Sequence, residues 1–315
     1  MKKYLYSMYS ALKESRSNEI ILKSSKFEKN RIEAEIVRNV HSIEKGLSIR
    51  KPRAGFGIKK ISEMFLLVDR YMSLCDEKTV MFLVVDAVDE YLEFQANIGF
   101  DSPEIKAIRI KNESLIEKIG AHEGKCGGTL LFDAKEARFD EAEIERFFNT
   151  RHSIREFSGE PVPKEMVLRA VELAQRAPSA CNRQAVRVYS ISSDDYIKSV
   201  GNLDGIGGFA EDVDQFLLIT GVKSAYRRGE KNQFAVSASM FAAYLTLSLH
   251  ALGVGVCTVQ RSLVADKVFV KFRETYGIPE DEQIVVMLGI GMLSDEIKVP
   301  VSKRYPLEKI YKELK

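Results

Sequence analysis

The sequence contains no tryptophan and only four cysteines and four histidines among its 315 residues. No two of the cysteines form a C-x-x-C pair, and they stand far apart in the chain, at Cys75, Cys126, Cys181 and Cys257. This spacing argues against a disulfide framework and against a structural zinc site. The histidines form no H-E-x-x-H motif, so the sequence predicts no metal centre.

A large charge of one sign is also missing. Lys and Arg total 47 and Asp and Glu total 45, which gives a formal net charge of +2. A protein that coats nucleic acid would carry a large basic excess. No apolar run approaches the roughly 20 residues of a membrane helix, and the start of the chain turns polar too early for a signal peptide. We therefore expect a cytoplasmic protein with no nucleic-acid partner and no membrane span.

Two modest domains fit a chain of this length. We place a boundary near Asp140, with a mainly helical N-terminal extension over residues 1–140 and a second domain over 141–315. In the extension, apolar residues recur at helical spacing from residue 32 to residue 40, and residues 61–74 and 80–98 are predicted helices. The first 30 or so residues are polar and predict only a loosely attached helix.

The second domain alternates predicted helices and strands, which indicates the α+β class. Helices are expected over 141–148, from Pro163 onward and over 234–252, and strands over 185–192, 216–222, 255–259 and 283–292. The helix 234–252 has no Asp, Glu, Lys or Arg. Such a helix is either buried on every side or covered in a subunit interface.

Four short stretches of the second domain carry residues suited to ligand binding. In the first, Arg151-His152-Ser153-Ile154-Arg155, alternate side chains of an extended segment point the same way. Arg151, Ser153 and Arg155 would then converge and could hold a phosphate, because guanidinium groups form bidentate, charge-assisted hydrogen bonds. A surface salt-bridge cluster with Glu156 or Glu160 is the alternative.

The second stretch, Ala177-Pro178-Ser179-Ala180-Cys181-Asn182-Arg183-Gln184, joins a helix to a strand. Its small residues would let a flat polar ring approach the backbone, and Asn182 and Gln184 would supply donors and acceptors. An ordinary connecting loop would have the same composition. The third stretch, 252–258, has glycines that permit close approach of a ligand, and Gly253 also suits a helix C-cap.

The fourth stretch is the glycine-bearing strand end at 288–292, followed by Lys303-Arg304-Tyr305-Pro306-Leu307. Lys303 and Arg304 could complete the phosphate site, or they could be a solvated basic pair. Taken together and in this order, the four stretches resemble the nitroreductase family over roughly residues 143–315. The first stretch lies about 25 residues ahead of the second, as in that family.

The resemblance implies a nitroreductase-like fold, with a mixed sheet flanked by helices, in a homodimer that binds two FMN molecules at its interface. It implies that Arg151, Ser153 and Arg304 hold the FMN phosphate, that Arg155 lies beside the N1/O2 edge of the ring, and that Pro178, Ser179 and Asn182 come from the partner chain. The whole implied cofactor set is Arg151, His152, Ser153, Arg155, Pro178, Ser179, Ala180, Asn182, Gln184, Val256, Cys257, Thr258, Lys303 and Arg304.

The implied activity is transfer of two electrons from NADH or NADPH, through the flavin, to a quinone, a nitro compound or a specific metabolite. No side chain is expected to act as a catalytic group, because the chemistry belongs to the flavin. Two departures are visible: Ala180 replaces the family's second serine, and Ala185-Val186 replaces its Pro-Trp. Asn202 is a candidate for a further contact to the ring.

The N-terminal region, from Arg38 to Leu47 and from Pro52 to Gly57, resembles the helical extension of nitroreductase-family proteins associated with polysaccharide biosynthesis. His41, Glu44, Lys45 and the basic loop 50–60 could bind an anionic substrate or cover the flavin, or the region could be a helical cap. Two other functions stay open: a flavin-bound module without turnover, whose N-terminal region binds a partner or a sugar-linked ligand, and flavin-fragmenting chemistry in the same fold.

Overall fold

The computed structural model describes residues 19–200, 206, 208–259 and 267–314. Its α-helices are α2 (Glu28–Ser48), α3 (Ile58–Met72), α4 (Thr79–Asn97), α5 (Pro103–Ile119), α6 (Glu141–Thr150), α7 (Lys164–Ala174), α8 (Ser193–Val200), α9 (Gln233–Ala251) and α10 (Lys267–Thr275). The strands are β1 (Val186–Ser192), β2 (Gln215–Val222), β3 (Val254–Val259) and β4 (Glu282–Met292). Short 3-10 turns are η1 (Ser25–Phe27), η2 (Ala180–Asn182), η3 (Ala210–Asp212), η4 (Lys223–Ala225) and η5 (Leu307–Lys309).

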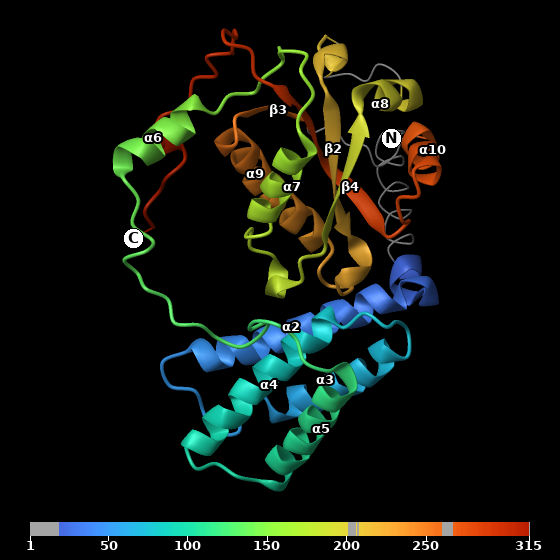
Figure 1. Cartoon of the computed structure of the whole chain (residues 1–315), viewed down its shortest axis with the longest axis vertical. Coiled ribbons are helices and arrows are strands. Elements are labelled where there is room, and N and C mark those ends of the chain that lie inside the picture. Colours follow the sequence, from blue (N-terminus) through green and yellow to red (C-terminus); the bar gives the residue numbers. More distant parts are fainter. Residues whose placement is uncertain (1–18, 201–205, 207, 260–266, 315) are drawn as a thin grey trace.

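Helices α2–α5 pack around a hydrophobic core of their own. On α2, the apolar residues Ile32, Ile36, Val40 and Ile43 recur every three or four positions, and all four are buried against the other helices. Helix α5 begins at a clear signal, because the Ser102 hydroxyl accepts a hydrogen bond from the Ile105 N–H and Pro103 occupies the first turn. Figure 1 shows α2 between the other three helices and the rest of the molecule.

The second part of the chain is built on a four-stranded sheet in the order β1-β2-β4-β3. Every pair in this sheet is antiparallel. The expected mixture of parallel and antiparallel pairs is therefore not seen among the described strands. β2 and β3 do run in the same direction, but β4 lies between them, so no parallel pair forms.

Helices cover both faces of the sheet. Successive residues of β2 alternate between the two layers: Phe216 and Leu218 pack in the core that includes residues of α8 and α10, whereas Leu217 and Ile219 pack in the core that includes residues of α7 and α9. All four side chains are buried. A strand with apolar residues on both faces explains why β2 is apolar without interruption.

Helix α9 is buried on one side only. Ala238, Leu245 and Leu249 pack against the sheet, but Val236, Met240 and Tyr244 are 48%, 38% and 41% exposed. The sequence left open whether this helix is enclosed or lies in an interface, and the described part of the chain does not enclose it. Among the described helices, α9 alone is long and apolar enough to suit a membrane span, but a core helix passes the same test.

Helix α2 joins the helical region to the sheet. Ala34 of α2 packs in a small core with Ala185, Val222 and Phe234. Around it, Arg227 donates two hydrogen bonds to the carboxylate of Glu35, at 2.8 and 2.6 Å. The helical region therefore lies directly against the segments that flank β1 and β2 (Figure 1).

The α+β class and the helical N-terminal region are confirmed. The predicted helices 61–74, 80–98 and 234–252 correspond to α3, α4 and α9, and the four predicted strands correspond to β1–β4. Helices α5, α8 and α10 were not predicted. Most of the first 30 residues, for which a loose helix was expected, lie outside the described residues, as does Asn202.

The glycines near the end of the sheet have a role that the sequence did not reveal. A Cβ atom at Gly291 would stand 2.6 Å from the Phe157 ring, and one at Gly255 would stand 3.0 Å from it. The Phe157 ring thus packs directly over both glycines. Gly253 does end α9, with φ of 76° and its N–H donating to His250 O at 3.1 Å.

We expect Gly291→Ala to lower the free energy of unfolding by about 1–3 kcal/mol, because the added methyl group overpacks the Phe157 ring. Urea denaturation of the two proteins measures this change. Gly229→Ala is the control, since a Cβ atom there would meet nothing within 4 Å. If Gly291→Ala is no less stable than Gly229→Ala, the ring does not rest on Gly291. Adding Phe157→Ala should make the double variant less destabilised than the sum of the two changes.

Candidate functional site

The first predicted stretch lies along the end of the sheet. After α6, the N–H of Ile154 donates to Val256 O at 2.9 Å, and the N–H of Ser158 donates to Met292 O at 2.9 Å. These two bonds fix residues 154–158 beside β3 and β4. The extended backbone that the sequence analysis assumed for alternating side chains is present at Arg151, with φ −78° and ψ 111°.

Arg151 and His152 lie at the C-terminal end of α9. With Thr150, Ile154, Thr246, His250, Val254, Gly255, Val256 and Leu293 they line a cavity of about 50 Å³. The His250 Nε2 atom is 3.1 Å from Phe147 O and 3.1 Å from the Thr150 hydroxyl, so it ties the end of α6 to α9. Burial lowers the pKa of His250, and the nearby charges of Arg151 and His152 lower it further.

Arg155 contacts a different set of groups. Its guanidinium lies 5.8 Å from the centre of the Phe209 ring, and its Nη1 donates to Ser153 O at 3.4 Å. Burial raises the pKa of the Cys257 thiol, and the charge of Arg155 offsets part of this rise. Cys257 is therefore a protonated, buried thiol on β3. The convergence of Arg151, Ser153 and Arg155 on one phosphate stays a prediction.

The second predicted stretch is a tightly folded loop. Cys181, Asn182 and Gln184 adopt φ values of 55°, 54° and 50°, which side chains other than glycine rarely take. The Ser179 hydroxyl accepts a hydrogen bond from the Gln184 N–H at 3.1 Å and holds the loop closed. Pro178, Ser179 and Gln184 line a cavity of about 320 Å³ with residues of α7, β1 and α9, and Asn182 is exposed.

Arg183, which the sequence analysis did not single out, anchors this loop from beneath. Its side chain is only 1% exposed and donates to Glu230 at 3.0 Å. The guanidinium also lies 5.0 Å from the centre of the Tyr226 ring. The Glu230 carboxylate in turn accepts a hydrogen bond from the Arg227 N–H, and Arg227 binds Glu35 of α2. Sequence spacing gives no signal for this chain of contacts, because its members come from three separate segments.

These contacts leave the predicted site in separate places within one chain. The loop 178–184 lies near the start of α9, where the Ala180 N–H donates to the Ser237 hydroxyl at 3.4 Å, whereas Arg151 lies near its end, at His250. At 1.5 Å per residue, these two ends of α9 are about 20 Å apart. Val256 and Cys257 of β3 are buried, and Thr258 is exposed.

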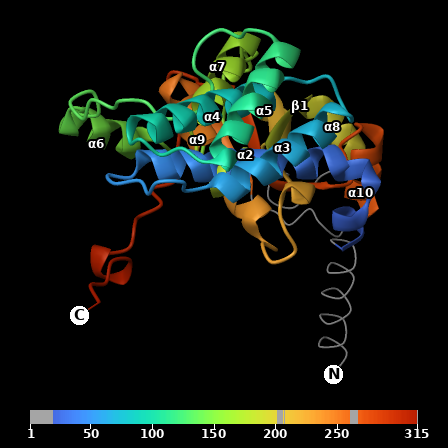
Figure 2. The same cartoon turned by 90° about the horizontal axis from the view of Figure 1, so that it is seen from below.

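Lys303 and Arg304 belong to a C-terminal arm, residues 293–314, that leaves the body of the protein (Figure 2). Both side chains are exposed, and Arg304 donates to Ser302 O at 3.1 Å. The cavity that Arg151 lines contains neither of them. The arm therefore does not complete the predicted phosphate site within the described part of this chain.

The polar residues predicted in the N-terminal region pack at the end of α2. His41 Nδ1 is 3.7 Å from Glu44, and burial raises the pKa of Glu44. In the loop 50–60, the Phe56 ring packs edge-on against Tyr91 with centroids 5.1 Å apart. These contacts fit the alternative in which the region is a packed helical cap, and the basic side chains of Arg50, Lys51 and Arg53 stay exposed.

Comparison with known proteins identifies only the second part of the chain. The model of the nitroreductase family matches residues 149–221 and 203–292. A search of curated proteins found no significant match. Similar solved structures include a protein from Desulfovibrio desulfuricans, described as a nitroreductase in complex with FMN, with 19% identity and a TM-score of 0.46 over 56% of this chain and 99% of that chain. An FMN-dependent nitroreductase from Clostridium difficile has 23% identity and a TM-score of 0.45 over 53% and 98%.

We expect protonation of His250 to destabilise the fold. Its pKa is lowered in the folded state, so between the ordinary histidine value of about 6.5 and that lower value the unfolded chain binds more protons. The free energy of unfolding should therefore fall as the pH falls through this window. In His250→Gln this fall should be smaller, which urea denaturation from about pH 7.5 to about pH 5 will measure. Equal pH dependence in both proteins would contradict the assignment.

Proposed function

We propose that the protein is an FMN-dependent oxidoreductase, because the model of the nitroreductase family matches residues 149–221 and 203–292. It passes two electrons from NADH or NADPH, through the flavin, to a quinone, a nitro compound or a specific metabolite. The observation that carries this proposal is the cationic segment 151–155, seated at the end of the sheet by the hydrogen bond from Ile154 to Val256. A cytoplasmic location stays a prediction from the sequence.

The residues present fit the chemical groups of FMN. Arg151 and Arg304 offer guanidinium donors and Ser153 a hydroxyl, which together suit a phosphate. Asn182 and Gln184 are exposed amides on a loop whose neighbours Pro178 and Ser179 face a cavity. When bound, FMN supplies the two-electron chemistry. The positive charge of Arg155 beside the ring edge would stabilise the negative charge that reduction adds there.

A homodimer would bring the separated halves of the site together. Two chains related by a twofold axis could place the loop 178–184 of one protomer against segment 151–155 of its partner. Within each chain the ion pair of Arg183 with Glu230 holds this loop, and Arg227 joins that pair to Glu35 of the helical region. Each flavin would then touch both chains.

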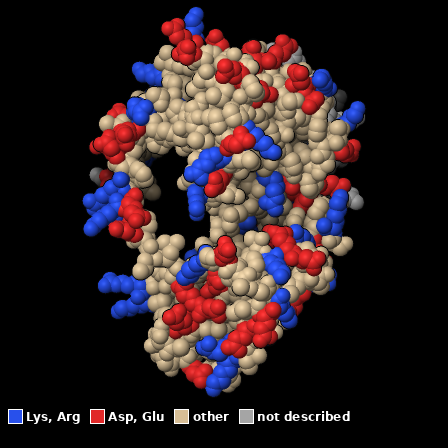
Figure 3. All heavy atoms as spheres, viewed as in Figure 1, with Lys and Arg blue, Asp and Glu red and all other residues tan. Residues whose placement is uncertain are grey.

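Exposed apolar side chains support the dimer. They lie on the outer side of α9 (Val236, Met240 and Tyr244), on the strap formed by residues 130–140, and along the C-terminal arm. In the strap, Leu130, Leu131 and Phe132 are 79%, 103% and 69% exposed, and the space-filling view shows an opening between the strap and the rest of the molecule (Figure 3). Apolar surface of this extent marks a protein–protein contact.

The test of the proposed function begins with purified full-length protein that is incubated with FMN and then separated from unbound FMN. A yellow protein with a flavin spectrum that bleaches on anaerobic addition of NADH or NADPH, and recovers when a quinone is added, supports the oxidoreductase. Bound flavin that does not bleach would instead indicate a module without turnover, and recovery of a cleaved flavin product would indicate fragmentation. A protein without measurable affinity for FMN would contradict the oxidoreductase, the module without turnover and the flavin-fragmenting enzyme alike.

We expect Arg151→Ala to weaken FMN binding. Loss of one charge-assisted hydrogen bond to the phosphate costs about 1.5–3 kcal/mol, or roughly a ten- to hundredfold increase in Kd. Fluorescence titration with FMN measures this change. Arg169→Ala is the matched control, because Arg169 lies on the exposed side of α7 and pairs with Glu172. Equal Kd values for the two variants would remove Arg151 from the cofactor site.

Light scattering should give twice the chain mass of 35.6 kDa. Met240→Asp combined with Tyr244→Asp places two charges on the exposed side of α9 and should shift the protein toward a monomer with lower FMN content. Leu66→Asp is the control, since Leu66 is 64% exposed on α3, away from the proposed interface. A monomeric unaltered protein, or a double variant that stays dimeric with full FMN content, would contradict this interface.

A further inference from the structure

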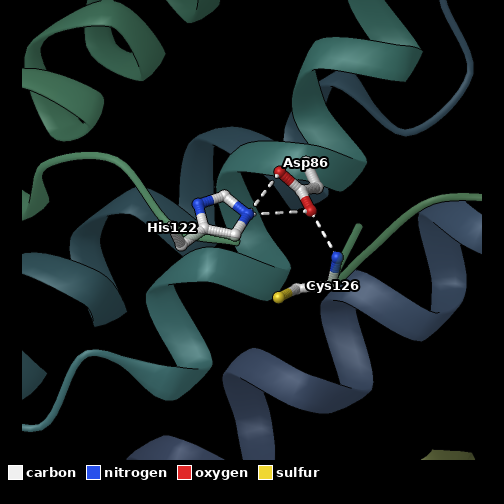
Figure 4. Close-up of side chains that lie close together, drawn as sticks. All are labelled: Asp86, His122 and Cys126. Atoms are coloured by element: carbon white, nitrogen blue, oxygen red, sulfur yellow. Dashed lines mark hydrogen bonds and ion pairs between the residues drawn. The ribbon is translucent and has the colours of Figure 1, made fainter. Parts of the chain in front are cut away.

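Three side chains of the helical region that can bind a metal ion lie together at the surface. Asp86 comes from α4, and His122 and Cys126 come from the loop after α5. One ligand atom from each, a carboxylate oxygen, an imidazole nitrogen and the thiol sulfur, lie within 4.8 Å of one another. Figure 4 shows the three side chains around one small space. They lie outside residues 149–292, so the family assignment does not account for them.

The loop that carries His122 and Cys126 is held firmly on α4. The Asp86 carboxylate accepts hydrogen bonds from the N–H groups of Cys126 and Gly127, at 2.5 and 3.2 Å. One turn further along α4, the Glu90 carboxylate accepts a hydrogen bond from the Thr129 N–H at 2.8 Å. A Cβ atom at Gly127 would stand 2.3 Å from Leu83 O, so only glycine lets the loop approach the helix this closely.

The imidazole ring is also fixed. It stacks on the Phe82 ring with centroids 4.5 Å apart and an interplanar angle of 23°. Its Nε2 atom is 3.1 Å from one Asp86 oxygen and 3.2 Å from the other. The side chains of His122 and Asp86 are only 18% and 16% exposed, whereas Cys126 is exposed. The thiol of exposed Cys126 thus lies beside an ordered nitrogen–oxygen pair.

These distances suit a small divalent cation. Zinc binds nitrogen and oxygen at about 2.0–2.2 Å and thiolate sulfur at about 2.3 Å, which places neighbouring ligands of a tetrahedral ion roughly 3.3–3.7 Å apart. The separation of Nε2 from the Asp86 oxygens is already near this range. The Cys126 sulfur lies within 4.8 Å of the other two ligand atoms, so metal binding would require its exposed side chain to move closer to them.

We propose that Asp86, His122 and Cys126 bind a zinc-like divalent cation, with the fourth position open to water or to a substrate group. Binding forms one metal–sulfur bond and releases the thiol proton to solvent, without oxidation or reduction. Imidazole, carboxylate and thiolate ligands together select zinc over magnesium or calcium, which bind oxygen ligands. Three protein ligands and one open position are typical of zinc sites that bind a further molecule.

The alternative is a purely structural cluster, in which Nε2–H donates to Asp86 and the thiol has no role. The two explanations differ in what Cys126 does. The bonds that hold the loop come from the Cys126 backbone N–H and not from its sulfur. Cys126→Ser should therefore keep the fold and lose metal affinity. Asp86 is left unaltered in the test, because it also holds the loop backbone.

The experiment titrates metal-free, reduced full-length protein with Co²⁺ under anaerobic conditions. We expect one equivalent to bind with a thiolate-to-cobalt charge-transfer band in the near ultraviolet, and Zn²⁺ to displace it. Cys126→Ser should lose the band, and Cys126→Ser and His122→Gln should each weaken Zn²⁺ binding at least tenfold in competition with a chromophoric chelator. Cys75→Ser, which alters another cysteine of the helical region, should bind like the unaltered protein.

The absence of stoichiometric binding, or an undiminished charge-transfer band in Cys126→Ser, would overturn the proposal. So would equal Zn²⁺ affinity in Cys126→Ser and the unaltered protein. The FMN content of each variant is measured in parallel and should stay unchanged, since these residues lie outside the proposed flavin site. A failure of the metal site is thus distinguishable from a failure of the proposed oxidoreductase function.

Discussion

The candidate cofactor site depends on how segment 154–158 is attached to the sheet. The hydrogen bond from Ile154 to Val256 fixes the segment beside β3, and the Phe157 ring can pack there only because Gly255 and Gly291 have no side chains. Arg155 then projects toward Phe209, and Arg151 stays at the end of α9. A few contacts over two glycines thus decide where the cationic groups point.

Much of the architecture could be predicted from the sequence, because it follows from local rules. Ile32, Ile36 and Val40 at helical spacing indicate α2, and the uninterrupted apolar run of β2 indicates a strand buried on both faces. Helix α5 was missed although Ser102 and Pro103 mark its start. The absence of parallel pairs among the described strands could not be predicted, since it depends on β4 lying between β2 and β3.

The site was harder to predict than the fold. The order of the motif stretches indicated the family, but nothing in the sequence shows that Arg183 finds Glu230, 47 residues away. The same holds for Asp86, His122 and Cys126, because His122 and Cys126 stand four residues apart outside any known motif, and Asp86 joins them only where α4 packs beside their loop. The sequence prediction of no metal site considered only the spacing of residues along the chain. A metal site requires ligand atoms that lie close together in three dimensions, whatever their separation in sequence.

A chain of ion pairs and hydrogen bonds connects the helical region to the candidate cofactor loop. Glu35 of α2 binds Arg227, whose N–H donates to Glu230, and Glu230 binds the buried Arg183. Burial raises the pKa of Glu35, but the hydrogen bonds from Arg227 and Arg38 outweigh it and hold the pKa below its usual range. The core of α2–α5, in contrast, is built from described residues between 32 and 119. Because its contacts are local in sequence, this bundle can fold on the ribosome before β4 has been synthesised. Helix α2 is then already folded when the loops of the second part pack against it.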